Sequence, residues 1–301
     1  MRSQMKSVGS VASGLFLSAV CMGTLLLNVP GAQAQNLFVI DDALLKIAAD
    51  GKQTRFPYSM SGAYGLACDS SGNVLLEWRG NITRLTPDGT PSGIVAQGLN
   101  LDGPLACDSA DNVYAMGQNG GLIYKFAPNG SQTIITTGLG APSTFPSLGL
   151  AANDAGEVFG VAHSIIFRIE PDGTENVFAS GVPGSGGVDR LAIDREGDLF
   201  LSCGSSIEKF TPDGTQTTFV SGLPSASALA FDNMDNLFAS VSDGTIYRFT
   251  PDGTQSTYAS GLTDPFVLAF QTVPEPSDWE IFAVGATALL ARCRRPRATS
   301  R

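Results

Sequence analysis

Short runs of apolar, aromatic and β-branched residues alternate with clusters of Gly, Pro, Asp, Asn and Ser along residues 36–271. One stretch has such runs at 229–231, 237–240, 245–249 and 256–259, with turn residues between them. Short runs of this composition, bounded by turn residues, predict β-strands. The pattern therefore predicts four strands in each such stretch and essentially no helix in this part of the chain.

The stretch recurs along the chain. Pro-Asp-Gly and its variants return at spacings of 38 to 43 residues, with glycines at Gly51, Gly89, Gly130, Gly173, Gly214 and Gly253. Proline sets φ for the second position of a type I turn and glycine accepts the left-handed one, so this motif predicts a hairpin between the third and fourth strands. Spacings near 40 residues are typical of propeller repeats.

A second repeated turn, at 69–73, 108–112 and 194–198, joins the first strand of a repeat to the second. Its aspartates suggest calcium, which takes oxygen ligands. Each loop offers too few ligands, however, and an Asx turn explains the same residues. We therefore predict a structural turn rather than a metal site.

The two ends of the repeat region complete each other. Residues 36–58 align with strands two, three and four of a repeat and lack the first strand, while 266–270 supply a first strand after the last complete repeat. Pairing these ends makes a closed ring without open sheet edges. The predicted fold class is all-β: a six-bladed β-propeller with four-stranded blades over residues 35–272.

The repeats read Gly-Leu-Ala-x-Asp-x-x-Gly-Asn-Val/Leu-Phe and Ile-x-x-Phe-x-Pro-Asp-Gly. In this form, residues 36–271 resemble NHL-repeat and streptogramin-lyase-like propellers, and more distantly the gluconolactonase group. The resemblance implies the propeller architecture of these families. Activity stays open, because such rings serve as binding scaffolds, lactonases and lyases.

The N-terminal segment reads as an export signal. Arg2 and Lys6 precede an apolar run over 8–27, and Ala32-Gln33-Ala34 follows. A charged start, an apolar stretch and a small-residue site are typical of a signal peptide, here residues 1–34 with cleavage after Ala34. The alternative is an uncleaved anchor, because the run is longer than the usual apolar region of about 7–15 residues.

The C-terminal segment, 273–301, has three parts. Pro274, Glu275 and Pro276 lead into an apolar stretch over 281–291, and four arginines follow within 292–297. The stretch is shorter than the roughly 20 residues that span a bilayer, so it predicts a marginal membrane helix with cytoplasmic arginines. The segment resembles the PEP-CTERM sorting signal of Gram-negative bacteria. That resemblance implies removal by an exosortase-type enzyme and a final place in the periplasm, on the outer cell surface or outside the cell.

The net charge of residues 35–272, called the body below, limits the kinds of partner that it can bind. Residues 35–272 carry eleven Lys and Arg against 25 Asp and Glu, a formal net charge of −14. A body this acidic lacks the basic footprint that a phosphate backbone requires. Nucleic-acid binding is therefore not expected.

Any site particular to this protein is expected among the irregular second-to-third turns and blade crossings, which share one face of a propeller. The candidate ligand-binding residues there are Trp78, Arg79, His163, Asp189 and Arg190. Trp78 and Arg79 suit sugar stacking or a cation–π contact. The alternative is a tryptophan that fills a wedge between blades. The single histidine, His163, rules out a multi-histidine metal site.

No catalytic residue, metal or cofactor is assigned from the sequence, and Cys68, Cys107 and Cys203 are interpreted as thiols that fill the core. The leading hypothesis is a non-enzymatic exported propeller that binds a cell-envelope polysaccharide or protein, with a membrane contact through its C-terminal helix before processing. The alternative is a hydrolase or lyase with its site at the mouth of the central channel.

Overall fold

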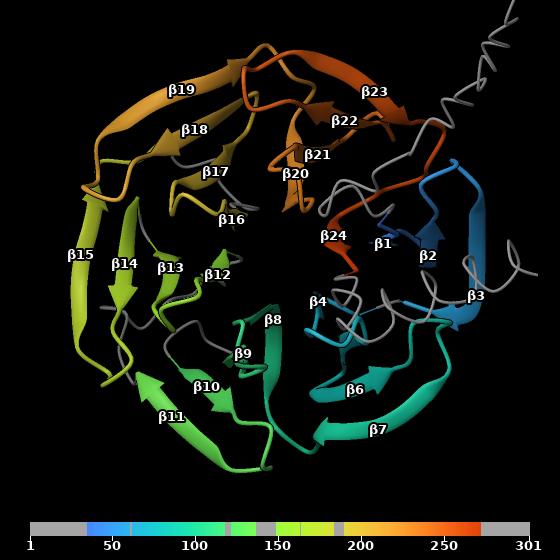
Figure 1. Cartoon of the computed structure of the whole chain (residues 1–301), viewed down its shortest axis with the longest axis vertical. Coiled ribbons are helices and arrows are strands. Elements are labelled where there is room, and N and C mark those ends of the chain that lie inside the picture. Colours follow the sequence, from blue (N-terminus) through green and yellow to red (C-terminus); the bar gives the residue numbers. More distant parts are fainter. Residues whose placement is uncertain are drawn as a thin grey trace, which may run out of the picture. The chain divides into compact units, whose positions relative to one another are not determined.

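The computed structural model describes residues 35–60, 62–117, 122–136, 149–162, 164–183 and 190–271. Within these residues, 24 strands form six four-stranded antiparallel sheets. The sheets, called blades 1 to 6 below, stand around a common axis with one edge toward the centre (Figure 1). No helix in the described ranges is long and apolar enough to cross a membrane.

Every blade runs from an innermost strand at the centre of the ring to an outermost strand at its rim. Blade 1 is, in that order, β24 (Val267–Phe270), β1 (Leu37–Ile40), β2 (Ala43–Ile47) and β3 (Gln53–Ser59); blade 2 is β4 (Gly65–Cys68), β5 (Val74–Trp78), β6 (Asn81–Leu85) and β7 (Pro91–Ala96). Blade 3 is β8 (Leu101–Cys107), β9 (Val113–Gly117), β10 (Ile123–Phe126) and β11 (Gln132–Thr136); blade 4 is β12 (Leu150–Ala152), β13 (Val158–Ala162), β14 (Ile165–Ile169) and β15 (Glu175–Ser180). Blade 5 is β16 (Leu191–Ile193), β17 (Leu199–Cys203), β18 (Ser206–Phe210) and β19 (Gln216–Ser221); blade 6 is β20 (Ala226–Phe231), β21 (Leu237–Val241), β22 (Ile246–Phe249) and β23 (Gln255–Ala259).

Blade 1 is shared between the two ends of the ring. β24 pairs antiparallel with β1, from Leu37 opposite Phe270 to Ile40 opposite Val267. The pairing covers the edge of β1 and joins the two ends of the repeat region within one blade. The prediction of a six-bladed propeller closed by its terminal strands is confirmed.

The third-to-fourth turns have the predicted geometry and one feature that the pattern did not reveal. In blade 6 the Gly253 amide donates to the Thr250 carbonyl at 2.7 Å, and Gly253 has φ of +84°. The Thr250 hydroxyl also donates to the Asp252 carboxylate, which accepts the Thr254 amide at 3.0 Å. Hydrogen bonding to the charged form lowers the pKa of Asp252 below its usual value.

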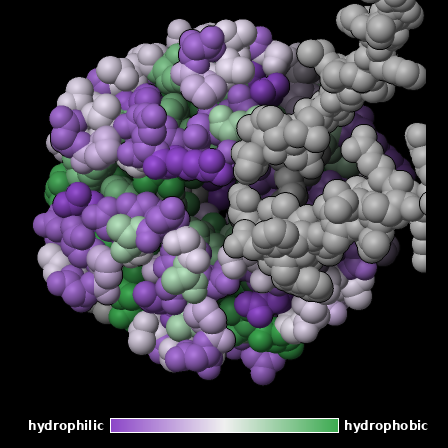
Figure 2. Space-filling model, in the orientation of Figure 1, coloured by the Kyte–Doolittle hydropathy of each residue, from purple (hydrophilic) through white to green (hydrophobic). Residues whose placement is uncertain are grey.

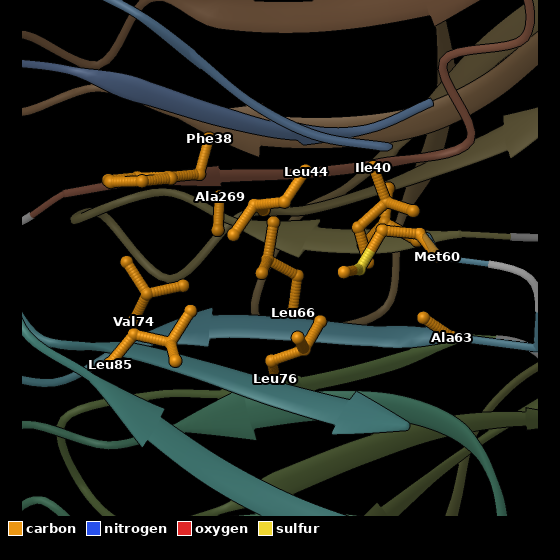
Figure 3. Close-up of a cluster of buried hydrophobic side chains, with 11 residues drawn as sticks. Phe38, Ile40, Leu44, Met60, Ala63, Leu66, Val74, Leu76, Leu85 and Ala269 are labelled. Atoms are coloured by element: carbon orange, nitrogen blue, oxygen red, sulfur yellow. The ribbon is translucent and has the colours of Figure 1, made fainter. Parts of the chain in front are cut away.

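The hydrophobic core lies between blades. The buried apolar residues form six clusters, and each cluster joins the facing sides of two neighbouring blades. Between blades 1 and 2, for example, Phe38 and Leu44 pack with Leu66, Val74 and Leu76 (Figure 3). Fully burying a side chain of this size stabilises a fold by about 1.5–3 kcal/mol, so each blade draws its stability from both neighbours.

A ring of six leucines, one from each innermost strand, surrounds the central channel. Its members are Leu66, Leu105, Leu150, Leu191, Leu229 and Leu268, and none is more than 6% exposed. They border a cavity of about 60 Å³. The inner strands of all six blades therefore meet at one apolar constriction.

Candidate functional site

The ring has two faces with different contents. The turn face carries the first-to-second and third-to-fourth turns, and the crossing face carries the second-to-third turns and the blade crossings. The side of the ring seen in Figure 2 is mostly hydrophilic, with hydrophobic residues in small separate patches. Small scattered patches are normal on a soluble surface, so single residues have to be weighed one by one.

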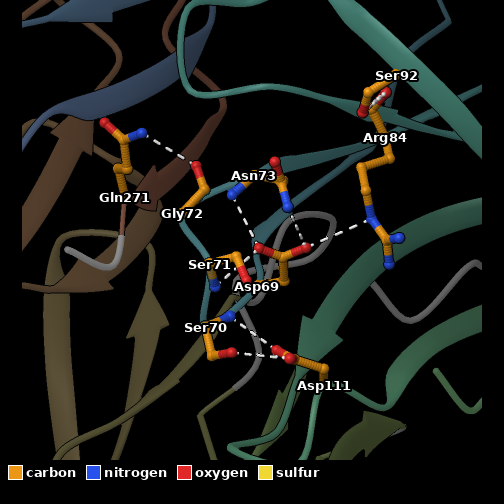
Figure 4. A network of polar contacts seen from close by, with 9 residues as sticks. All are labelled: Asp69, Ser70, Ser71, Gly72, Asn73, Arg84, Ser92, Asp111 and Gln271. Carbon is orange, nitrogen blue, oxygen red and sulfur yellow. Dashed lines mark hydrogen bonds and ion pairs between the residues drawn. The ribbon is translucent and has the colours of Figure 1, made fainter. Parts of the chain in front are cut away.

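On the turn face, the acidic residues of the first-to-second turns hold their own backbone. Asp69 accepts the Asn73 amide at 2.8 Å and the Ser71 amide at 3.1 Å, and it faces Arg84 Nε at 3.4 Å (Figure 4). Asp108 and Asp232 repeat the two backbone contacts in blades 3 and 6. These carboxylates form Asx turns, which stabilise the loops without a ligand.

Two aspartates bridge neighbouring blades. Asp111 has φ of +60°, and its carboxylate accepts the Ser70 amide and the Ser70 hydroxyl, each at 2.7 Å. Asp235, with φ of +57°, accepts the Arg195 amide at 3.4 Å. The other complete blades place glycine at this position. An Asp at a left-handed turn position is the signal in the sequence, but its partner becomes visible only when the blades are assembled.

A basic column on the third strands was missed by sequence reasoning. It holds six of the eleven basic residues of the body: Lys46, Arg84, Lys125, Arg168, Lys209 and Arg248. Lys209 forms an ion pair with Asp198 at 2.5 Å, and Lys125 lies 5.5 Å from the Tyr114 ring centroid. Arg84 and Arg168 also form ion pairs with acidic side chains, and Lys46 lies over the Phe38 ring, so these contacts have a structural role.

The turn face also has a hollow of about 320 Å³ over blades 4 to 6. It is lined by Asp154, Asp194 and Asp232 among others. Burial raises the pKa of Asp194, whose carboxylate accepts the Glu196 and Asp198 amides. Among the described residues, no group of three or more His, Cys, Asp or Glu is arranged to hold a metal ion.

The crossing face brings Trp78 and Arg79 together. Trp78 is 40% exposed, so it is not a wedge buried between blades, and the Arg79 guanidinium carbon lies 5.1 Å from its ring centroid. Trp78 pairs with Asn81, so Arg79 and Gly80 form a two-residue turn, with Arg79 at φ of +52°. Blade 5 has Gly204, at φ of +58°, in the corresponding place. A left-handed arginine is strained, and such strain concentrates at functional sites.

Glu77 holds the backbone next to Trp78 and Arg79 through hydrogen bonds. Its side chain is buried, and its carboxylate accepts the Tyr64 amide at 3.3 Å and the Gly80 amide at 2.9 Å. Because Gly65 pairs with Glu77, Tyr64 and Trp78 stand at the same end of their strands, and Tyr64 is 39% exposed. We call Tyr64, Trp78 and Arg79 the aromatic platform. Tyr64 was missed because it lies in an irregular crossing, and its place beside Trp78 depends on the register of β4 with β5.

The other three predicted site residues, His163, Asp189 and Arg190, are not found beside Trp78 and Arg79. His163 and Asp189 lie outside the described residues. Arg190 immediately precedes β16 and is 6% exposed at the wall of the channel cavity. It belongs to blade 5, across the ring from blade 2 (Figure 1), so it does not join the aromatic platform.

The three described cysteines, Cys68, Cys107 and Cys203, form no disulfide with one another. Cys203 is buried, and Cys68 and Cys107 pack against the clusters on either side of blade 2. Burial raises the pKa of Cys68, and it raises that of Cys107 to about 12. Thiols with raised pKa values are poor nucleophiles at neutral pH, which fits a core-filling role.

Comparison with known proteins shows the fold. No protein-family model matches the sequence, and no curated protein matches it. Among solved structures, a streptogramin B lyase matches with a TM-score of 0.54 and 17% identity over 75% of this chain and 74% of that chain. A catalytically inactive virginiamycin B lyase from Staphylococcus aureus with quinupristin matches with a TM-score of 0.56 and 17% identity, over 77% of this chain and 86% of that chain. A structure described as a putative gluconolactonase matches with a TM-score of 0.52 and 17% identity, over 74% of this chain and 83% of that chain.

The chain is a six-bladed β-propeller. Identities this low support the shared ring and carry no activity from one protein to another. The expected likeness to streptogramin-lyase-like and gluconolactonase-like rings is confirmed as a likeness of fold.

Proposed function

We propose that this protein is an exported, non-enzymatic propeller that binds a cell-envelope glycan through the aromatic platform of Tyr64, Trp78 and Arg79. One observation carries the proposal: an exposed tryptophan is held beside an arginine in a strained backbone conformation that the corresponding turn of blade 5 avoids with glycine. Strain that the fold can avoid elsewhere points to a use for the side chain.

The chemistry of the platform suits a sugar ring. Aromatic side chains offer a large apolar face for the C–H side of a pyranose, and Tyr64 adds a hydroxyl at the rim. The guanidinium of Arg79 carries five N–H donors, which match sugar hydroxyls or a carboxylate. Glu77 holds the backbone on both sides of the platform, so little ordering is needed on binding.

The binding test uses the complete chain with Trp279→Phe, because Trp78 and Trp279 are its two tryptophans. Fluorescence then reports on Trp78 alone as neutral and acidic polysaccharides are added. We expect a binding-dependent change that Arg79→Ala weakens and that Met234→Ala, an exposed apolar residue on the turn face, leaves intact. If an envelope protein is captured while all polysaccharides fail, the partner is a protein and the glycan proposal is wrong.

Export and sorting form the second part of the proposal, supported by the two terminal sequences. Residues 1–34 would direct export, and the tail from 273 would hold the precursor in the inner membrane until an exosortase-type enzyme removes it. Both segments lie outside the described residues. In a host with the sorting enzyme, Glu275→Ala with Pro276→Ala should trap folded precursor in the membrane fraction. Unchanged processing would leave a plain membrane anchor.

The competing function is a hydrolase or lyase at the channel mouth, and the shared ring of the lyase structures is the observation that favours it. Elemental analysis of the purified chain separates the two. A divalent ion bound one to one, together with turnover that Trp78→Ala does not affect, would favour the enzyme over the glycan-binding protein.

A further inference from the structure

The first-to-second turn of blade 1 is open, because the repeat region begins and ends in it. The Gln271 amide donates to the Asn36 carbonyl at 2.9 Å. In blade 6 the Asp232 amide makes the same bond to the Asn236 carbonyl, at 3.1 Å. Both asparagines directly precede the second strand of their blade. The residue before each asparagine therefore occupies the same turn position, and in blade 1 that residue is Gln35.

A side chain at this position can bridge to the turn of the preceding blade. In blades 3 and 6 an aspartate stands here and accepts the backbone amide of Ser70 or Arg195 in the blade before it. Gln35 makes the corresponding contact to blade 6, because its Oε1 accepts the Asn233 amide at 2.7 Å. The start of the body is thus held to the ring by a side-chain carbonyl oxygen.

The predicted signal-peptide cleavage after Ala34 makes Gln35 the first residue of the exported chain. This step rests on the proposed export of the protein, since residues 1–34 lie outside the described part of the chain. Cleavage gives Gln35 a free α-amine, which can reach the amide carbon of its own side chain and close a lactam ring. The residue that bridges blades 1 and 6 is therefore also a residue with a reactive end.

We propose that Gln35 is a modification site, converted to pyroglutamate in the exported protein with the Asn233 amide as the donor that assists ring closure. The α-amine nitrogen attacks Cδ of the side chain and forms a C–N bond. The bond from Cδ to Nε2 then breaks, the proton lost by the amine passes to Nε2, and ammonia leaves. No atom is oxidised or reduced, so the step needs no co-reactant.

The hydrogen bond to Gln35 lies where the reaction develops charge. As Cδ becomes tetrahedral, negative charge gathers on Oε1, and the Asn233 N–H is already 2.7 Å from this oxygen. The turn that presents this N–H is itself held, because the Asp232 carboxylate accepts the amides of Met234 and Asn236. A donor fixed before the reaction acts like one group of an oxyanion hole, so the folded chain should close the ring faster than the unfolded chain.

Ring closure keeps the bridge and protects the end of the chain. The lactam retains the side-chain oxygen of Gln35 as a carbonyl acceptor, and only Nε2 is lost. The α-amine becomes a neutral amide, so an aminopeptidase that binds a free amine no longer recognises this end. Trimming from an unprotected end would remove the bridge and then reach β1, whose pairing with β24 closes the ring.

The first test measures the mass of the N-terminal peptide after the complete chain has been exported and purified. A peptide that begins at residue 35 and is lighter by one ammonia supports the proposal. Unmodified Gln35 at this end overturns the proposal and leaves the proposed export intact. An uncleaved chain, or a different first residue, contradicts the export boundary, and the proposed modification fails with it.

The second test measures the rate of ring closure, with a removable tag in place of residues 1–34 so that cutting the tag starts the reaction. Asn233→Pro removes the donor. Proline suits this turn position, because the Asp235 amide donates to the Asp232 carbonyl and neither residue between them has a positive φ. Loss of ammonia should slow by about threefold to tenfold, the effect of one hydrogen bond. Ser109→Pro, at the same position of the blade 3 turn, is the matched control and should react at the wild-type rate.

The wild type in urea provides a comparison that does not depend on the folding of a variant. The unfolded wild type should lose ammonia more slowly than the folded wild type, and at the same rate as unfolded Asn233→Pro. Equal rates for the folded and unfolded wild type, or for folded wild type and folded Asn233→Pro, would overturn the assisted closure.

Discussion

The turn face and the crossing face use the same kinds of residue for different ends. On the turn face, Asp69, Asp108 and Asp232 accept backbone amides of their own turns, Lys209 forms an ion pair with an acidic turn and Lys125 lies over an aromatic ring. On the crossing face, Trp78, Arg79 and Arg190 each depart from what other blades place in the same position. A charge that recurs around the ring serves the ring, whereas a charge found in one blade calls for another explanation.

The contrast has an energetic side. Each turn-face contact belongs to a local loop or joins two blades, so its loss should lower stability. Arg79 is strained, so its loss should leave stability nearly unchanged. Stability measurements can therefore separate scaffold residues from candidate binding residues.

The largest effect is expected from removing the closure of blade 1. Deleting residues 264–271 takes away β24, exposes the edge of β1 and opens the clusters on both sides of the blade. We expect aggregation or loss of the single cooperative unfolding transition. Deleting 274–301 instead is the matched control and should leave the transition intact. A sharp transition at the wild-type temperature without β24 would contradict terminal closure.

Two glycines at the same position of equivalent turns, in blades 5 and 6, separate backbone strain from steric clash. Gly214 and Gly253 have φ of +86° and +84°, but a Cβ at Gly214 would lie 2.8 Å from the Phe178 carbonyl oxygen, and a Cβ at Gly253 meets nothing within 4 Å. Alanine should cost about 1–3 kcal/mol of unfolding free energy through strain at either site. Gly214→Ala should cost more than Gly253→Ala in urea unfolding. Equal losses would show that the neighbouring blade gives way freely.

The bridge between blades 2 and 3 offers a test in which a better backbone residue makes the fold less stable. Asp111→Gly relieves a left-handed aspartate but removes the bonds to the amide and hydroxyl of Ser70. We expect a loss of about 1 kcal/mol. Asp235→Gly is the control, because its single bond to Arg195 is longer, and it should lose less. A gain in stability for Asp111→Gly would show that the bridge contributes nothing.

Sequence reasoning reached the fold because the evidence for it is repeated and local. Each turn glycine and the incomplete repeat at residues 36–58 indicate the local structure of their own segment. Because the pattern occurs six times, a chance match is excluded. The candidate site was reached only in part. Trp78 and Arg79 are adjacent in sequence, so their departure from the repeat was visible. Tyr64 was not, because its place beside Trp78 depends on the register of β4 with β5.

Burial was the harder quantity to predict. Arg190 follows a glycine-rich crossing, a composition typical of exposed loops, and its burial arises when six inner strands close around it. The partners of Asp111 and the basic column likewise depend on how blades and strands meet. Contacts between distant parts of the chain were therefore the part that the pattern alone did not provide.

Acid should weaken the turn face gradually. Hydrogen bonds from threonine hydroxyls and from backbone amides lower the pKa values of Asp88, Asp213 and Asp252 in the folded state. A lowered pKa stabilises the fold above the unfolded value of about 3.9, and this contribution is lost as the pH falls through the folded value. Unfolding free energy should drop below about pH 5, and replacing all three by Asn should flatten that drop. If the unfolding free energies of the wild type and the triple Asn variant changed with pH in the same way, these aspartates would not cause the acid sensitivity.

The smallest effect on stability is expected where the proposed function is strongest. Arg79→Gly places the residue of blade 5 in the turn of blade 2, and relief of left-handed strain, about 1–2 kcal/mol, is offset by the roughly 0.5–1 kcal/mol entropic cost of glycine. Unfolding free energy should therefore stay the same or rise slightly, while polysaccharide binding falls. The reverse change, Gly204→Arg, should destabilise by about 1 kcal/mol. If Arg79→Gly were clearly less stable than the wild type, Arg79 would belong to the scaffold, and the contrast between the two faces would fail at the residue on which the proposal depends.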